Sequence, residues 1–332
     1  MKNGELIKDY LVLTDPSGGA QGQWALAQKG PEVYFLKQFL SPKYPGLNGP
    51  GSAAVREKKL ADCAQFEQRN RHLHSSLNSN QLGAGNLVVA TEFFRVGTTY
   101  YKATNVVVGC GLESVRSLSP HQALVVIRTL LLSVRLLHKA GFVHGDLKPE
   151  NVVIQETRPG IFVSKLIDFD DGYIVGLPPG RDQVVGDQRF YSPELLRYIK
   201  DDASTTGEDL TTASDMFALG LLIHFLLTDR LPSFDRERYS WAAEAAMHHE
   251  LEIDGVKGPV KAWLEMLTKT DRHERPLIDD LLYFFLDFTA EELSDCLFTL
   301  SGRKLAPKPK MIEPDTELPE KTSTLKSTIK KK

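Results

Sequence analysis

The residues best suited to chemistry stand together in one short segment, His144–Asn151, with the sequence HGDLKPEN. Asp146 and Asn151 are five positions apart, so one loop can present a carboxylate and an amide side by side. This pair suits phosphoryl transfer, in which a carboxylate accepts the proton of the acceptor hydroxyl and an amide oxygen holds a metal ion. Lys148 lies between them and supplies a positive charge that would steady the transferring phosphate.

A second carboxylate follows this segment along the chain. Asp168 stands seventeen residues after Asn151, at the end of an apolar run that ends at Ile167. Such a run predicts a strand, and the strand would deliver Asp168 to the same place as Asn151. The two segments together predict a metal site with Asn151 and Asp168 as ligands.

Two kinds of secondary structure would position these residues. Short β-rich runs separated by Gly and Pro predict strands, and one helix rich in Ala, Glu, Lys and Gln interrupts them at 53–77. After residue 118 the pattern is helical, and Ser119 with Gln122 forms the capping box of a long helix that ends at Gly141. The predicted strands are 10–13, 23–28, 33–39, 87–94 and 99–108, and the further helices 194–198, 215–227, 239–248, 260–267, 277–285 and 289–297.

These elements predict an α+β fold of two lobes. Residues 1–9 are an N-terminal extension, 10–108 a small β-rich N-lobe with one main helix, and 109–300 a larger helical C-lobe. The basic residues 301–332 have almost no large apolar side chains and are predicted to be a disordered tail.

Composition excludes several classes of protein. The formal net charge of −3 is too near balance for a nucleic-acid coat. The longest apolar stretch, 216–227, is too short to cross a membrane, and the three cysteines lack metal-binding or disulfide spacing. We therefore expect a cytoplasmic protein that binds neither nucleic acid nor membranes.

These segments resemble the protein kinase superfamily, in the eukaryotic-like (Hanks-type) serine/threonine branch and of the soluble bacterial kind. The sequence HGDLKPEN resembles the catalytic loop of that family, and Asp168-Phe169-Asp170 its metal-binding loop. Further landmarks follow in the expected order over residues 10–286. They are the strand lysine Lys37, the triplet Ser192-Pro193-Glu194, the central-helix aspartate Asp215, and Arg275, which would pair with Glu194.

The resemblance implies a two-lobed protein kinase-like fold, ATP as phosphate donor and Mg²⁺ as metal, with Mn²⁺ as an alternative. It assigns Asp146, Lys148 and Asn151 to catalysis, Asn151 and Asp168 to the metal, and Lys37 to the phosphates of ATP. The carboxylate that pairs with Lys37 would be Glu67, with Glu57 as the alternative. The other nucleotide-binding residues implied are Gly19, Gly22, Thr104, Asn105, Val107 and Val153.

The sequence departs from the family pattern at several positions. Gly145 replaces an arginine that in many relatives binds a phosphate on the activation loop, and no Ser or Thr occurs between Asp168 and Tyr191. We therefore expect activity without activation-loop phosphorylation. Trp24 and Phe35 stand where the family has Val and Ala over the adenine, which is the best argument for an ATP-binding pseudokinase scaffold.

The expected function is transfer of the ATP γ-phosphate to a Ser or Thr hydroxyl of a protein. A small-molecule phosphotransferase of the aminoglycoside or choline type is the second alternative, and Lys148 argues against it. A metal-dependent phosphatase would oppose such a kinase. Autophosphorylation of the tail would use its hydroxyl residues Thr316, Thr322, Ser323, Thr324, Ser327 and Thr328.

Overall fold

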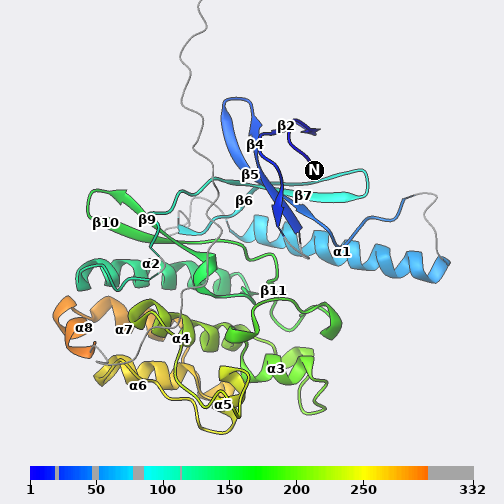
Figure 1. The fold of residues 1–332 in the computed structure, drawn as a ribbon. Helices are drawn as coiled ribbons and strands as arrows, with labels where there is room; N and C mark the ends of the chain where they lie inside the picture. Colours follow the sequence, from blue (N-terminus) through cyan, green and yellow to red (C-terminus); the bar gives the residue numbers. More distant parts are fainter. Residues whose placement is uncertain (19–21, 47–51, 78–85, 113, 298–332) are drawn as a thin grey trace, which may run out of the picture. The chain divides into compact units, whose positions relative to one another are not determined.

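An antiparallel sheet of seven strands occupies the N-terminal part of the chain in the computed structural model (Figure 1). The structure describes residues 1–18, 22–46, 52–77, 86–112 and 114–297. The strand order is β1-β2-β4-β5-β7-β6, and β3 pairs with β4. The strands are β1 (Leu6–Ile7), β2 (Tyr10–Val12), β3 (Ser17–Gly18), β4 (Gly22–Lys29), β5 (Glu32–Phe39), β6 (Ala90–Val96) and β7 (Thr99–Asn105).

The register of the three central strands collects a set of side chains on one face. Trp24 of β4 pairs with Lys37 of β5, which pairs in turn with Lys102 of β7. Phe35 pairs with Thr104 in the same sheet. Since alternate side chains of a strand share a face, all five lie on the same side of the sheet.

Helix α1 (Ala53–Ser76) packs on this sheet by a short apolar stripe. Its N-cap is Ser52, whose hydroxyl accepts a hydrogen bond from the Val55 N–H group. Phe66 lies in an aromatic cluster with Phe39 and Tyr100, at ring-centroid distances of 5.0 and 5.2 Å. The aromatic cluster therefore fixes which side of α1 faces the strands.

In the described part of the chain, seven helices follow the sheet and lie together (Figure 1). Their buried apolar side chains share one large hydrophobic core. Ser119 and Gln122 form the predicted capping box at the start of α2. Among the described helices, α2 is long and apolar enough to cross a membrane, but half of its apolar window is buried, as in the core helix of a folded domain. The helices are α2 (Pro120–Lys139), α3 (Pro193–Ile199), α4 (Thr212–Thr228), α5 (Ala242–Met247), α6 (Gly258–Leu267), α7 (Ile278–Asp287) and α8 (Ala290–Cys296).

Two small antiparallel pairs carry the chemically important segments. Strands β9 (Val152–Arg158) and β10 (Ile161–Leu166) form a hairpin that lies over α2, and β8 (Phe142–Val143) pairs with β11 (Tyr173–Ile174). The segment His144–Asn151 therefore lies between β8 and β9, and Asp168 lies between β10 and β11. The strand predicted to deliver Asp168 is present as β10, whereas its partner β9 was not among the predicted strands, although Pro159 and Gly160 are turn residues that indicate a hairpin.

The predicted α+β fold with a β-rich N-lobe and a helical C-lobe is confirmed. The observed strands and helices agree with the predicted ranges to within a few residues at most ends. Gly19 and the predicted tail at 301–332 lie outside the described residues.

Candidate active site

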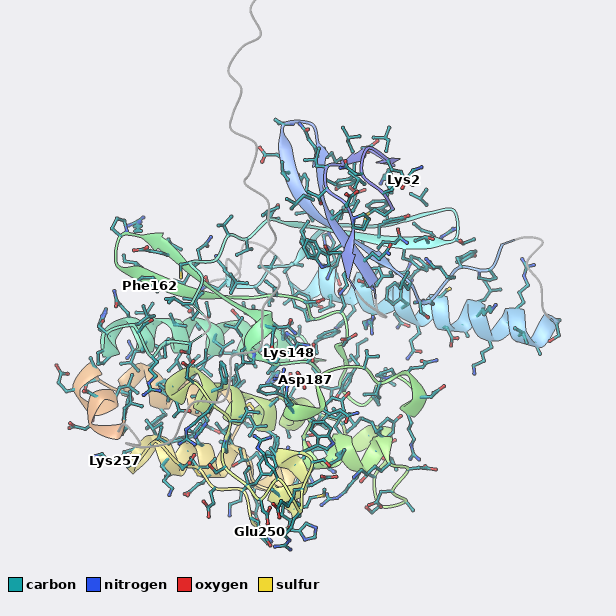
Figure 2. The ribbon with its side chains drawn as sticks, viewed as in Figure 1. Lys2, Lys148, Phe162, Asp187, Glu250 and Lys257 are labelled. Atoms are coloured by element: carbon teal, nitrogen blue, oxygen red, sulfur yellow. The ribbon has the colours of Figure 1, made fainter. Side chains whose placement is uncertain are left out.

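The loop between β8 and β9 brings Asp146, Lys148 and Asn151 together. Asp146 is buried, and its Oδ2 atom accepts a hydrogen bond from Asn151 Nδ2 at 3.0 Å. The Lys148 ammonium pairs with the same oxygen. The second oxygen, Oδ1, accepts a hydrogen bond of 3.0 Å from the N–H of Asp187. Lys148 and Asp187, both labelled in Figure 2, thus reach Asp146 from two different segments.

The side chain of Asp215 on α4 binds the backbone of the loop between β8 and β9. Its carboxylate accepts hydrogen bonds from the N–H groups of His144 at 2.7 Å and Gly145 at 3.1 Å, and from His138 Nε2 at 3.0 Å. Burial favours the neutral acid, but His138 and the backbone donors outweigh it and hold the pKa of Asp215 below its ordinary value. The loop therefore rests on a buried charged carboxylate.

Gly145 is required by the backbone geometry at this point. Its φ angle is +76°, and a Cβ atom there would lie 3.0 Å from the carbonyl oxygen of Asp171. Both the left-handed backbone and the close contact disfavour a side chain. The arginine that many relatives carry here does not fit this loop.

Asp168 and Asp170 of the loop after β10 lie against two lysines of the sheet. Lys37 Nζ is 2.8 Å from Asp168 Oδ1 and 2.7 Å from Asp170 Oδ2. The buried Lys102 pairs with the other oxygen of Asp170. Two carboxylates and two ammonium groups therefore form one cluster of zero net charge.

The charges of this cluster shift the pKa values of its members. Burial works to raise the pKa of Asp170, but Lys102 and Lys37 outweigh it, and the pKa lies below the ordinary value. The pKa of Asp168 is raised, by burial first and then by the negative charge of Asp170. Burial works to lower the pKa of Lys37, yet Asp170 and Asp168 raise it above its ordinary value. Asp170 is thus the carboxylate that the two lysines keep charged.

The structure does not bring Glu67 to Lys37, so the predicted ion pair between them is wrong. Glu67 Oε1 accepts a hydrogen bond of 2.7 Å from the Tyr100 hydroxyl, and Arg71 lies 3.6 Å from its other oxygen. The alternative, Glu57, is exposed on α1. The physical reason is that Phe66 packs into the aromatic cluster, which turns Glu67 toward Tyr100.

The residues predicted to bind the adenine lie at the end of β7 and on the segment that follows. Thr104 is buried, and Asn105 ends the strand. After Val107 the chain runs beside β9, where the Cys110 N–H donates to the Ile154 carbonyl at 2.9 Å. Val153 lies against this segment, because a Cβ atom at Gly109 would be 2.9 Å from its Cγ1 atom.

Gly22 and two aromatic side chains line the same face of the sheet as Lys37. A Cβ atom at Gly22 would lie 3.4 Å from Lys37 Cε and 2.9 Å from the Gln38 carbonyl oxygen, so the backbone approaches the lysine closely. Trp24 and Phe35 stack with ring centroids 4.9 Å apart and an interplanar angle of 23°. These are the two residues that stand, by resemblance to the family pattern, at the positions over the adenine.

Asn151 and Asp168 have the donor chemistry of a magnesium site. The Asn151 carbonyl accepts a hydrogen bond of 2.9 Å from the Ile167 N–H, which places the two segments side by side. The Asn151 amide nitrogen donates to Asp146, so the amide oxygen is the atom that remains for a cation. Mg²⁺ prefers one or two such oxygen ligands together with phosphates and water. The two residues therefore fit the ion.

The predicted pair of Glu194 and Arg275 is present and buried. Arg275 Nη1 lies 2.7 Å from Glu194 Oε1, and Nη2 lies 2.8 Å from Oε2, in a bidentate pair. Ser214 of α4 also donates to Glu194 at 2.9 Å. This network ties α3 to α4 and to the loop before α7.

Lys102 is the residue of this site that the sequence pattern did not identify. A lysine within a β-rich run is expected to be an exposed strand residue. In the structure, the Lys102 side chain is buried and pairs with Asp170. The spacing does contain one indication of its position: Lys102 stands two residues before Thr104, so in a strand the two side chains lie on the same face of the sheet.

Asp171 gives the site a pH dependence that can be measured. Burial, followed by the charges of Asp146 and Asp170, raises the pKa of Asp171 to about 6 from 3.8. The folded state therefore holds this proton more tightly than the unfolded state, and the contribution of Asp171 to stability falls as the pH rises from about 4 to about 6.

Asp171→Asn is expected to raise the free energy of unfolding by about 1 to 3 kcal/mol at pH 7.5 and to have little effect near pH 4. Urea denaturation of both proteins across this pH range, in metal-free buffer, would measure the difference. A difference that does not change with pH would contradict the shifted pKa.

Comparisons with known proteins agree with this geometry. The sequence pattern described as the protein kinase domain matches residues 56–284. The chain is similar to serine/threonine-protein kinase D of Synechocystis sp., with 27% identity over 181 residues that cover 51% of this chain and 32% of that protein. It is 32% identical over 199 residues to death-associated protein kinase dapk-1 of Caenorhabditis elegans, covering 54% of this chain and 13% of the relative.

A third relative extends over more of the chain. Serine/threonine-protein kinase PSK2 of Saccharomyces cerevisiae is 26% identical over 285 residues, which cover 83% of this chain and 23% of that protein. The chain therefore spans about a third or less of the length of these curated relatives.

Proposed function

The chain belongs to the protein kinase domain family, and from this premise we propose that it transfers the γ-phosphate of ATP to a Ser or Thr hydroxyl of a protein. The observation that carries the proposal is the arrangement around Asp146. A buried carboxylate, an ammonium group and an amide meet within hydrogen-bonding distance on one loop. In protein kinases, a catalytic-loop carboxylate accepts the proton of the acceptor hydroxyl and an asparagine amide of the same loop holds a metal ion.

Each residue of the loop has a separate role in the proposed reaction. Asp146 orients the acceptor hydroxyl and accepts its proton, and Lys148 stabilises the negative charge of the moving phosphoryl group. Lys37 binds the α- and β-phosphates of ATP. The close contact of Lys148 with Asp146 keeps positive charge beside the position where negative charge develops.

Asn151 and Asp168 would hold Mg²⁺, or Mn²⁺ in its place. When bound, the ion would neutralise phosphate charge and lower the cost of charge development during transfer. The backbone of Asp168 adopts a φ of 49°, which aspartate tolerates better than most residues. Such backbone conformations cluster at functional sites, which supports Asp168 as a metal ligand.

The buried pair of Glu194 and Arg275 favours a protein as the acceptor. It anchors α3, which begins directly after the segment from Asp187 to Tyr191, and that segment corresponds to the peptide-binding shelf of protein kinases. A second candidate function is an ATP-binding scaffold that transfers no phosphate. The stacked rings of Trp24 and Phe35 favour it, because they would reduce the space for the adenine ring.

Transfer of labelled phosphate from Mg²⁺-ATP to the chain itself and to a generic basic protein tests the proposal. Phosphoserine or phosphothreonine on either protein is the expected result. ATP binding without label would favour the scaffold, and label transferred only to an aminoglycoside or choline would favour the small-molecule phosphotransferase. The tail, with its hydroxyls between Thr316 and Thr328, is the proposed place of autophosphorylation, and a metal-dependent phosphatase is the proposed opposing enzyme.

Activity is proposed to be independent of activation-loop phosphorylation. Fixed ion pairs already hold this segment, since Arg189 pairs with Asp187 at 2.5 Å and with Glu150 of the catalytic loop at 3.1 Å. Gly145 leaves no arginine to bind a phosphate, and no Ser or Thr lies between Asp168 and Tyr191.

Treatment with a broad-specificity phosphatase is therefore expected to leave kcat unchanged within about twofold, because no phosphate is needed to order the segment. The measurement uses the full chain with the six hydroxyl residues from Thr316 to Thr328 and also Ser301 changed to Ala, so that tail phosphates do not contribute. A mock-treated sample is the control. Loss of most of the activity after treatment would contradict the proposal.

A further inference from the structure

Both carboxylates beside Lys37 lie on the metal-binding loop and not on helix α1. Lys37 Nζ donates hydrogen bonds to Asp168 and forms an ion pair with Asp170. Asp170 Oδ2 is 2.7 Å from Lys37 Nζ, and the other oxygen of Asp170 pairs with Lys102. The Asp170 side chain is only 10% exposed and the Lys102 side chain 9% exposed. Asp170 thus bridges two lysines on neighbouring strands in a largely dry environment, where such pairs keep a fixed geometry.

Helix α1 presents a cation to this loop. Arg69 Nη1 donates a hydrogen bond of 3.1 Å to the Gly172 carbonyl. Arg69 stands four positions before the buried Leu73, so the two residues share the inward face of the helix. Glu67 points elsewhere and is held by Tyr100. An arginine therefore occupies the inward face of α1 at the level of the loop.

Charge balance links Asp170 with Lys102. If residue 170 were glycine, Lys102 would be buried without its carboxylate partner, and Lys37 would keep only Asp168. A buried unpaired ammonium is costly, and Asp168 is also the residue proposed to hold the metal ion. With Asp170 present, Lys37 keeps a carboxylate partner that does not have to serve as a metal ligand.

We propose that Asp170 positions Lys37 for the phosphates of ATP, with Lys102 as its counter-charge, in the role that a helix glutamate has in other kinases. The inference rests on the proposed function. In those kinases a movement of the helix can separate the glutamate from the lysine. In this chain the positioning carboxylate moves with the metal-binding loop, so binding of ATP does not depend on a carboxylate from α1.

The test compares four full-length proteins: the wild type, Asp170→Asn, the double variant Asp170→Asn/Lys102→Met, and the matched control Glu67→Gln. Glutamine at 67 can still accept the hydrogen bond of Tyr100. Three quantities are measured for each protein: Tm, KM and kcat with Mg²⁺-ATP, and the Kd of a non-hydrolysable ATP analogue by calorimetry.

Asp170→Asn is expected to raise KM for ATP and the Kd of the analogue at least about tenfold, since a charged partner of Lys37 is lost. Its Tm is expected to fall, because Lys102 stays buried without a carboxylate. The double variant removes that penalty and is expected to recover Tm but not KM. Glu67→Gln is expected to leave KM within about twofold of the wild type.

The inference would be overturned if the double variant recovered both Tm and KM, because Asp170 would then only neutralise Lys102. It would also be overturned if Glu67→Gln raised KM as much as Asp170→Asn. Wild-type protein that binds the analogue without transferring phosphate would refute the proposed function alone, and the Kd values would still decide the role of Asp170. Wild-type protein that binds no analogue would refute both.

Discussion

Asp146→Asn is expected to lower kcat for phosphate transfer by at least about a hundredfold, because an amide cannot accept the proton of the acceptor hydroxyl. The substitution keeps the shape of the side chain. The amide oxygen of the variant can still accept the hydrogen bond that the Asp187 N–H donates to Asp146 in the wild type, whereas its amide nitrogen cannot accept from Lys148 or Asn151 as Oδ2 does. Asn151 still donates to the backbone carbonyl of residue 146, so the loop is expected to keep its backbone conformation. Labelled Mg²⁺-ATP with a basic acceptor protein measures the loss.

The matched control for this variant is Asp295→Asn, an exposed aspartate on α8, which is expected to keep full activity. Thermal melting of both variants would establish that they are folded. Retention of more than about a tenth of the activity in Asp146→Asn would contradict the assigned role. KM for ATP is expected to change little, since Lys37 and Asp168, the residues proposed to bind the nucleotide and its metal ion, are unchanged.

Arg275→Met is expected to lower the free energy of unfolding by about 3 to 5 kcal/mol, which would be the largest stability effect among the predictions. Arg275 and Glu194 are both at least 95% buried, and the arginine also donates to the carbonyl oxygens of Lys269, Ala213 and Thr270. Removal of the arginine leaves a buried carboxylate without its cation. Urea denaturation at pH 7.5 measures the loss.

The exposed pair of Arg238 and Glu250 provides the matched control. Its ion pair is equally short, 2.7 Å, but the Arg238 side chain is 58% exposed. Arg238→Met is expected to cost no more than about 1 kcal/mol, because water screens such a pair. Similar losses in Arg238→Met and Arg275→Met would contradict the argument from burial.

The pH dependence of Arg275→Met gives an independent check. Burial works to raise the pKa of Glu194, but the hydrogen bonds and charge of Arg275 outweigh it and hold the pKa below its ordinary value. The wild type therefore gains stability from this group above about pH 4.5 and loses it as the pH falls. In the variant, the buried Glu194 without its arginine would bind a proton more readily than in the unfolded chain, so the variant gains stability as the pH falls. The difference in unfolding free energy between wild type and Arg275→Met should therefore narrow as the pH falls from about 8 to about 5.

Local patterns in the sequence were sufficient for much of the fold and for the catalytic loop. The capping box at Ser119 starts helix α2 as predicted, because a cap depends on residues three positions apart. Asp146, Lys148 and Asn151 meet for the same reason, since all three belong to one loop of eight residues. Covalent geometry allows little freedom over such short distances.

The partner of Lys37 could not be predicted in this way. Asp168 is 131 positions from Lys37 in the sequence, and Asp170 is still further along the chain. Glu67 was the closer candidate, and the packing of Phe66 against Phe39 and Tyr100 turned it away. Which carboxylate pairs with Lys37 depends on how buried groups from distant segments pack together. The spacing of residues along the chain does not reveal that packing.

The sequence by itself therefore determined the chemistry that this protein carries, while the tertiary structure decided how its charges are paired. Residue types and short spacings specify which groups are present on each loop and strand. Which carboxylate keeps Lys37 in position, and why Lys102 is buried, follows from the balance of burial and charge where the sheet, α1 and the metal-binding loop meet. That balance exists only after the chain has folded, because water screens the same charges in the unfolded chain.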